Sequence, residues 1–154
     1  MNSFIVRAWK GSDGKFPGPQ PVSIERKHIP TLHSKKYVVA DKTDGVRKLL
    51  VCTPSGDRKF VDRAFNETDV DIKLPNTSKF GTILDGELMS DGTYIVYDGI
   101  LVCGISIMDV HLVTRLKIIT EFIRKSNDPK IKLKRFFPMK QFEYYIKEIL
   151  PTID

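Results

Sequence analysis

A lysine stands in a short polar turn between two apolar runs of the sequence. The turn reads Lys42-Thr43-Asp44-Gly45-Val46-Arg47, and apolar residues precede and follow it. A lysine amine suits attack on the α-phosphorus of a nucleoside triphosphate, because desolvation and nearby cations can lower its pKa and free the neutral amine. Arg47 and a divalent metal would supply such positive charge. The pattern therefore indicates a lysine nucleophile that forms a phosphoramidate with a nucleotide.

The same turn has a purely structural interpretation. Asp44-Gly45 between two apolar runs is a strong hairpin signal, and a lysine beside such a turn is an ordinary surface residue. Both interpretations predict strands over residues 37–40 and 46–53. The turn by itself leaves the two interpretations open.

A second polar group follows a buried strand predicted over residues 82–84. The sequence there reads Leu84-Asp85-Gly86-Glu87-Leu88. Residues two apart on a strand share a face, so Asp85 and Glu87 would point the same way. Two carboxylates on one face are costly unless they meet a metal, a cation or ligand hydroxyls. The alternative is one more solvated Asp-Gly turn.

An aspartate also interrupts the β-rich run over residues 93–104, where Tyr97-Asp98 precedes Gly99. Aspartate is disfavoured in the middle of a strand. An aromatic residue beside an aspartate could stack on a base and face a charged ligand. The alternative is that Tyr97 belongs to the core and Asp98 marks a bulge.

The remaining pattern predicts the elements that hold these residues. A helix over 111–125 has apolar residues at helical spacing and places Arg115 on its outer side. A last helix is expected from Pro138 to residue 150, and residues 23–33 read as a short helix or turn capped by Ser23 and ended by Pro30. Further strands are expected over 1–8, 59–62 and 131–137, turns at 54–57 and 90–92, a restricted Gly/Pro loop over 11–21 and an exposed loop with at most one short element over 66–79.

The composition is that of a globular protein with a basic balance. The 154 residues are 41% hydrophobic and carry a formal net charge of +6, which suits a polyanionic partner such as a triphosphate or RNA. Cys52 and Cys103 lie in apolar runs and are interpreted as small core residues of an intracellular protein. The three histidines, His28, His33 and His111, are expected at the surface or in caps. No signal peptide or membrane-spanning run is found, so no membrane partner is expected.

Taken in order, the motifs resemble a known family. They are Phe16-Pro17-Gly18-Pro19-Gln20-Pro21-Val22-Ser23, the lysine turn, Val61-Asp62-Arg63, Leu84–Leu88 and Tyr97-Asp98. This order resembles the messenger-RNA capping guanylyltransferases, in the superfamily that includes ATP-dependent DNA and RNA ligases. The lysine and Asp-Gly-Glu motifs belong to the whole superfamily, whereas the Phe-Pro-Gly stretch favours the capping enzymes over the ligases.

The resemblance implies a role for each matching residue. Lys42 would be the nucleophile that becomes lysyl-GMP, and Arg47 would contact the ribose or phosphate. Glu87 would bind the ribose or help to place the metal, and Tyr97 would stack on the guanine. Asp98 would be a further polar participant.

The resemblance also implies the ligands and partners. Gln20 and Ser23 would help to form the guanine side of the pocket. GTP would be the substrate, Mg²⁺ or Mn²⁺ the cofactor, and the 5′-diphosphate end of nascent RNA the acceptor of GMP. The expected location is intracellular, in the nucleus or at a cytoplasmic viral replication site.

The implied fold is α+β, with a largely antiparallel sheet and flanking helices as in the nucleotidyltransferase domains of DNA ligases and capping enzymes. Residues 1–154 are expected to be a partial domain, because the family's later acidic-Gly motif, lysine-pair motif and OB-fold are not found. Lys132, Lys134 and Arg135 do not have the lysine-pair pattern. A fragment, a split gene product that needs a companion chain, or a decayed copy would each fit. The alternatives for function are a ligase-type adenylyltransferase and a non-catalytic remnant that binds RNA or a partner.

Overall fold

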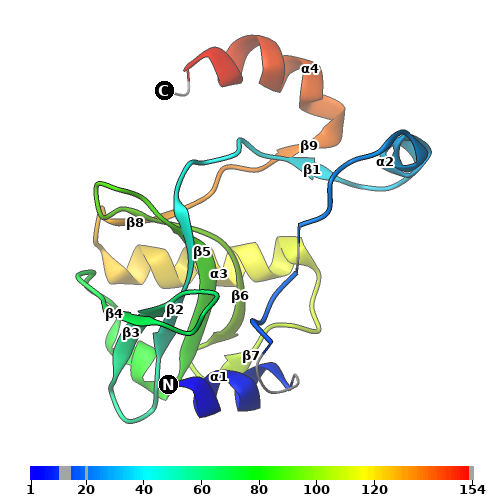
Figure 1. The fold of residues 1–154 in the computed structure, drawn as a ribbon. Helices are drawn as coiled ribbons and strands as arrows, with labels where there is room; N and C mark the ends of the chain where they lie inside the picture. The colour runs from blue at the N-terminus through cyan, green and yellow to red at the C-terminus, as the bar shows by residue number, and fades with distance from the viewer. Residues whose placement is uncertain (11–14, 20, 153–154) are drawn as a thin grey trace. The chain divides into compact units, whose positions relative to one another are not determined.

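The computed structural model describes residues 1–10, 15–19 and 21–152, and the chain forms two compact units (Figure 1). Unit 1 consists of Met1–Gly18 and Asp44–Leu133, and unit 2 consists of Pro19–Thr43 and Lys134–Asp154. Unit 1 holds the large sheet, whereas unit 2 joins two segments that lie far apart in the sequence.

The sheet of unit 1 is antiparallel along the order β4-β3-β2-β5-β6-β7, and β8 pairs in parallel with β6. The strands are β2 (Val46–Cys52), β3 (Arg58–Val61), β4 (Glu67–Asp69), β5 (Thr82–Leu88), β6 (Tyr94–Val102), β7 (Ile105–Ser106) and β8 (Ile131–Leu133). With its helices this is the α+β, largely antiparallel architecture that the sequence predicts.

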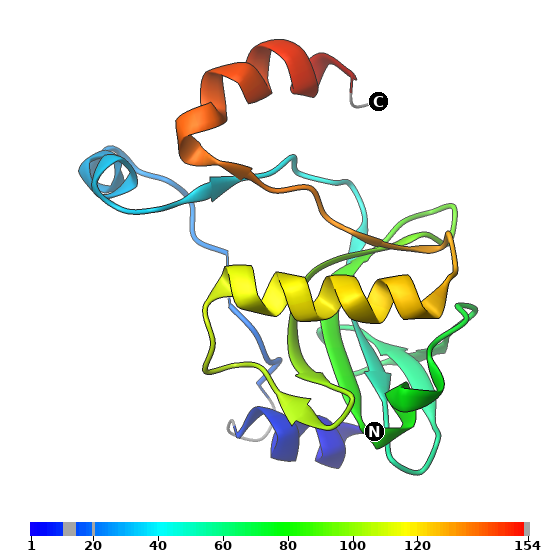
Figure 2. The same ribbon diagram turned by 180° about the vertical axis from the view of Figure 1, so that it is seen from behind.

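A helix covers each face of this sheet. The long helix α3 (Leu112–Ser126) covers one face, as Figure 2 shows, and its Ile119 and Phe122 belong to the same buried cluster as Leu50 and Tyr94. The short helix α1 (Asn2–Trp9) packs Ile5 on the other face, against a group that includes Leu49, Val51, Ile83 and Ile100. Burying a large aliphatic side chain contributes about 1.5–3 kcal/mol, so both faces stabilise the sheet.

Unit 2 contains a small two-stranded sheet and short helical segments. Strand β1 (Val38–Val39) pairs antiparallel with β9 (Phe137–Pro138), and the backbone N–H of Met139 donates to the carbonyl of Tyr37 at 2.9 Å. The helical segments are Arg26–His28, α2 (Ile29–Ser34), Met139–Gln141, α4 (Phe142–Tyr144), Tyr145–Ile149 and Leu150–Thr152.

Most of the central elements were predicted correctly. Strands β2, β3 and β6 and helix α3 lie where the periodicity places them, and α3 is capped by Asn127 in the left-handed conformation with φ 50°. The turn after β2 and the hairpin tip at 90–92 are also present, the latter closed by the N–H of Met89 donating to the carbonyl of Thr93 at 2.8 Å.

The predicted strand over residues 1–8 is wrong, because this segment forms helix α1. The alternation of Phe4, Val6 and Ala8 favoured a strand. The residues that pack on the core are instead Met1, Phe4, Ile5, Ala8 and Trp9, which follow the i, i+3, i+4 spacing of a helix. A run this short satisfies both periods, and contact with the sheet selects the helix.

The loop prediction for residues 66–79 is also wrong. Strand β4 and a 3-10 helix over Asn76–Phe80 lie within or across it. Ile72 and Leu74 are only 6% exposed and belong to the core on the α3 side. Ile72 and Leu74 alternate with the charged residues Asp71 and Lys73, so this segment buries its apolar side chains although its composition is polar.

The helix predicted after Ser23 begins later than expected. Ser23 is exposed and lies outside the first helical turn at Arg26–His28, where the N–H of Glu25 donates to Nδ1 of His28 at 3.0 Å. Pro30 does not end the helix. It occupies the first turn of α2, where proline's missing N–H costs nothing. His28 is therefore a capping residue, as predicted, and His111 lies exposed at the start of α3.

The C-terminal part departs from the prediction in detail. The basic strand ends at Leu133, and Pro138 belongs to β9, so the helical part starts at Met139. Of the predicted apolar stripe Tyr145 is buried, but Phe142 and Ile146 are each 41% exposed.

Cys52 is buried as expected, whereas Cys103 lies half-buried in the turn between β6 and β7 with φ 50°. Among the helices of the described residues, none has the length and apolar character needed to cross a membrane.

Candidate active site

The most buried ion pair of the described residues joins two neighbouring strands of unit 1. Arg47 on β2 donates from Nε to Oδ1 of Asp85 on β5 at 3.0 Å, and from Nη2 to Oδ2 at 2.5 Å. The side chains are only 13% and 2% exposed. Such a two-point contact fixes the plane of the guanidinium group as well as its position. Asp85 thus meets a cation, one of the partners that the sequence required for it.

Tyr97 joins this pair from the third strand, β6. Its hydroxyl group donates to Oδ1 of Asp85 at 2.9 Å. Tyr97 is half-buried, and it has no Cα partner on β5, because the register jumps from Gly86↔Val96 to Asp85↔Asp98. The core interpretation of Tyr97 is therefore wrong, whereas a bulge beside Asp98 is confirmed.

The Phe16-Pro17-Gly18 segment closes over the pair. The Phe16 ring lies 5.2 Å from Cζ of Arg47 and packs edge-on against Phe65, with 6.2 Å between ring centroids. Gly18 has φ +93°, and a Cβ there would lie 2.8 Å from Oδ2 of Asp85. Glycine is required at this position both for its backbone angle and for this close approach. The part of the predicted Gly/Pro loop over residues 16–18, which belongs to unit 1, is therefore a wall of the site.

The electrostatics of this cluster follow from burial and from the three hydrogen bonds. The pKa of Arg47 is raised, mainly by its hydrogen bonds to Asp85. Burial raises the pKa of Asp85, while the contacts with Arg47 and Tyr97 oppose that rise. Burial and the neighbouring charge of Asp85 raise the pKa of Tyr97, so its hydroxyl group stays protonated and donates at neutral pH.

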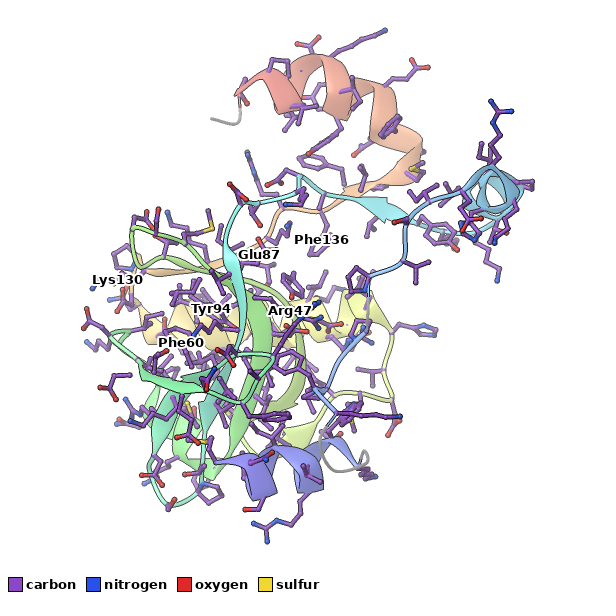
Figure 3. The ribbon with its side chains drawn as sticks, viewed as in Figure 1. Arg47, Phe60, Glu87, Tyr94, Lys130 and Phe136 are labelled. Atoms are coloured by element: carbon purple, nitrogen blue, oxygen red, sulfur yellow. The ribbon has the colours of Figure 1, made fainter. Side chains whose placement is uncertain are left out.

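Glu87 lies on the same face of the sheet as Arg47, because the two residues are directly opposite each other on β5 and β2 (Figure 3). Glu87 is half-buried. Gly45 allows the chain to enter β2 close to this residue, since a Cβ at position 45 would lie 3.0 Å from Cβ of Glu87 and 2.8 Å from Sδ of Met89. Close packing within unit 1 therefore explains why the lysine motif has a glycine at position 45.

Lys42 lies in unit 2, in the irregular segment that leads from β1 toward β2, and its side chain is exposed. The hairpin interpretation of this turn is wrong: β1 pairs with β9, while β2 pairs with β3 and β5. The adjacent Thr43 accepts a hydrogen bond through Oγ1 from Nζ of Lys134 at 3.0 Å. The lysine segment is therefore held by the C-terminal part of unit 2.

The other predicted residues are placed as follows. Ser23 is exposed in unit 2, and Gln20 lies outside the described residues. Asp98 points to α3, where Nε and Nη2 of Arg115 donate to its two oxygens at 2.7 and 2.9 Å. Direct contact of Ser23, Gln20 or Asp98 with a nucleotide stays a prediction.

A divalent metal in this site would need oxygen ligands from carboxylates, phosphates or water. The described residues contain no group of three or more histidine, cysteine or acidic side chains placed to hold an ion. Mg²⁺ commonly uses one or two carboxylates together with substrate phosphates and water. The half-buried carboxylate of Glu87, directly opposite Arg47, fits that manner of binding, whereas Asp85 is already held by Arg47.

Sequence reasoning missed Arg115, which it assigned to the solvent side of α3. Its side chain is only 19% exposed, because the guanidinium group is directed to Asp98. A signal was present: the buried positions of α3 are Ile119, Phe122 and Ser126, and one turn earlier the same stripe reaches position 115. An arginine on a buried stripe indicates a buried acidic partner.

Comparison with known proteins gives a consistent result. Residues 1–149 match the family model described as mRNA capping enzyme, catalytic domain. The chain is 35% identical over 151 residues to the mRNA-capping enzyme subunit alpha of Schizosaccharomyces pombe, an alignment that covers 83% of this chain and 37% of the relative.

Two further relatives agree. The mRNA-capping enzyme subunit alpha of Neurospora crassa is 36% identical over 99 residues, covering 56% of this chain and 25% of the relative. The mRNA-capping enzyme of Mus musculus is 28% identical over 137 residues, covering 80% of this chain and 23% of the relative. The chain thus spans well under half the length of the curated relatives that it matches.

Proposed function

The chain belongs to the family of mRNA capping enzyme catalytic domains, and from this premise we propose that it serves mRNA 5′ capping as a guanylyltransferase. GMP would pass from GTP, through a covalent bond to Lys42, to the 5′-diphosphate end of RNA. The observation that carries the proposal is the gathering of Arg47, Glu87 and Tyr97 around one face of the sheet, in a chain that matches the family over residues 1–149.

The first step forms the lysyl-GMP intermediate. The neutral Nζ of Lys42 attacks the α-phosphorus of GTP, the N–P bond forms, and the bond from that phosphorus to the oxygen that bridges the α- and β-phosphates breaks. Pyrophosphate leaves with the electron pair, and the nitrogen loses a proton to solvent.

The second step transfers GMP to RNA. A terminal β-phosphate oxygen of the RNA attacks the phosphorus, the new P–O bond forms, and the N–P bond breaks. Lys42 takes up a proton and returns to its starting state. A guanosine joined to the RNA through a triphosphate is the product.

The residues of unit 1 would bind and orient the nucleotide. The guanidinium group of Arg47, held by Asp85, would donate to the ribose or phosphate, and the Tyr97 ring would stack on the guanine. Base–aromatic stacking is worth about 1–3 kcal/mol per base in single-stranded nucleic-acid complexes. Glu87 would bind the ribose or hold Mg²⁺ or Mn²⁺, which when bound screens the triphosphate and stabilises charge on the leaving pyrophosphate.

Covalent labelling tests the proposal. The chain is incubated with divalent metal and GTP radiolabelled at the α-phosphate, alone and with a polypeptide that supplies the remaining length of a relative. Adducts are separated under alkaline denaturing conditions, because phosphoramidates are acid-labile. We expect label on the wild-type chain and on Lys36→Ala, which changes another exposed lysine of unit 2, and none on Lys42→Ala.

Two outcomes would overturn the proposal. If Lys42→Ala is still labelled, Lys42 is not the nucleophile. If no label appears either with the chain alone or with the added polypeptide, the covalent step does not occur. Labelling with ATP in place of GTP would instead support the ligase-type adenylyltransferase.

A further inference from the structure

The bulged strand β6 sends two consecutive side chains to two different partners. Tyr97 and Ile100 have no Cα partner on β5, so extra residues stand on either side of Asp98-Gly99. Tyr97 donates to Asp85 on the sheet, whereas Asp98 accepts from Arg115 on helix α3. A bulge bends a strand and redirects its side chains, so its conformation sets the direction of Tyr97.

The carboxylate of Asp98 holds both the bulge and the helix. Its Oδ1 accepts from the backbone N–H of Gly99 at 2.8 Å and from Nε of Arg115 at 2.7 Å, and its Oδ2 accepts from Nη2 of Arg115 at 2.9 Å. Nη1 of Arg115 also donates to the carbonyl of Val110 at 2.6 Å. The guanidinium group therefore connects the bulge to the segment that leads into α3.

Packing leaves this part of the strand little room to move. Gly99 is buried, and a Cβ there would lie 3.2 Å from a methyl group of Leu84 and 3.3 Å from methyl groups of Ile107 and Ile119. The side chains of Arg115 and Asp98 are only 19% and 14% exposed. A shielded two-point ion pair is geometrically specific, and lysine cannot reproduce its two parallel hydrogen bonds.

We propose that Arg115, acting through Asp98, is a positioning residue that holds the β6 bulge in the conformation that presents the Tyr97 ring to a purine base. The inference rests on the proposed function for the identity of the ligand, guanine nucleotide, but not for the placement of Tyr97. Arg115 lies on the helix that covers one face of the sheet, and it acts on a residue that bonds to Asp85 on the strands.

The test follows the Tyr97 ring directly. Arg115→Lys keeps the positive charge but loses the two-point contact, and Arg124→Lys is the matched control, because Arg124 makes an exposed ion pair with Glu121 on the same helix. The chain contains five tyrosines, so their isotope-labelled rings give a simple NMR spectrum in which Tyr97→Phe assigns the signal of Tyr97. We expect Arg115→Lys to shift that signal without ligand and Arg124→Lys to leave it in place.

Binding of GTP supplies the second measurement. Arg115→Lys should weaken binding about tenfold, within the range that stacking on one aromatic ring accounts for. The double variant with Tyr97→Ala should bind no more weakly than Tyr97→Ala alone, because Arg115 acts through that ring. Asp98→Asn should behave like Arg115→Lys.

An unshifted Tyr97 signal in Arg115→Lys would overturn the inference, as would losses of affinity that simply add in the double variant. If the wild-type chain binds no guanine nucleotide, the proposed function fails, whereas the Tyr97 signal still decides whether Arg115 holds the ring.

Discussion

The two units differ in how much of each is buried. In unit 1 the side chains of Leu49, Leu50 and Leu84 have no exposed surface, and both faces of the sheet are covered. In the described part of unit 2, Tyr145 is the one buried residue, while Val22 is 78% exposed. Local stability follows buried apolar contact, so unit 2 should open more easily than unit 1.

This difference separates the residues with proposed roles. Arg47, Asp85 and Tyr97 belong to the well-packed unit 1, whereas Lys42 belongs to unit 2. The groups that would recognise the nucleotide are thus held rigidly. The proposed nucleophile, Lys42, lies on a segment with few buried contacts, and elements that move during a reaction are commonly built in this way.

The largest expected effect concerns the buried ion pair of unit 1. Asp85→Ala leaves the guanidinium group of Arg47 without its partner in a site where that side chain is only 13% exposed. Loss of one partner of a buried pair costs about 3–5 kcal/mol. Urea denaturation measures the free energy of unfolding, and amide exchange in β2 and β5 measures the local change.

The matched control is Asp69→Ala, which removes the exposed partner of Lys59 in the same sheet. It should leave the unfolding midpoint close to that of the wild type. Equal losses for the two variants would contradict the special stability of the Arg47–Asp85 pair.

Two tyrosines give the sharpest comparison between the units. The hydroxyl group of Tyr94 accepts from the N–H of Leu50 at 3.2 Å and lies 2.9 Å and 3.0 Å from the carbonyl oxygens of Lys48 and Leu84. Tyr94→Phe should cost about 1–3 kcal/mol, because buried polar groups lose their partner. The hydroxyl group of Tyr145 is buried without a hydrogen-bond partner, so Tyr145→Phe should change stability by less than about 0.5 kcal/mol. A loss at Tyr145 that matches the loss at Tyr94 would remove the contrast.

Alkaline pH should weaken unit 1 through Cys52. Burial raises the pKa of its thiol from 9.0 to about 11. The unfolded chain therefore loses this proton first, and stability present below about pH 9 is lost as the pH rises toward about 11.

The difference in unfolding free energy between wild type and Cys52→Ala isolates this group. It should shrink by about 2 kcal/mol between about pH 8 and about pH 10.5. A difference that is independent of pH would show that the Cys52 thiol is not shielded from water.

The smallest expected effect concerns unit 2. Lys134→Met removes the hydrogen bond to Oγ1 of Thr43, and it should lower protection of the amides between Tyr37 and Thr43 by about 1 kcal/mol or less. Amide exchange measures this change, and protection in β2 should stay the same. If the loss of amide protection in Lys134→Met exceeded the loss of stability in Tyr94→Phe, unit 2 would not be the less stable unit.

Long periodic segments could be predicted because local pattern and tertiary contact agree in them. Helix α3 and strands β2 and β6 repeat their apolar residues over several turns or pleats. Helix α1 and the buried residues Ile72 and Leu74 could not be predicted in this way. Their segments are short, and packing against the sheet decides which of two periods is used.

The residue types of the candidate site could be proposed from the sequence. Lys42, Arg47, Glu87 and Tyr97 follow from ordered motifs, and Asp85 was recognised as a carboxylate that needs a partner. From the sequence, the partner of Asp85 could have been a metal, a ligand or a cation. In the structure, the register of β2 with β5 brings Arg47 within hydrogen-bond distance of Asp85. The role of Arg115 was missed, because the apolar spacing of a helix does not reveal which strand the helix packs on.

By itself the sequence determined the order of the motifs, the family to which they belong and the mostly antiparallel α+β character of the chain, since these depend on residue type and local period. Only the tertiary structure decided that Asp85 pairs with Arg47, that Asp98 pairs with Arg115, and that the lysine segment joins the C-terminal part in unit 2. Those pairings join residues that are distant along the chain. Their energies depend on burial and geometry, which no local pattern contains.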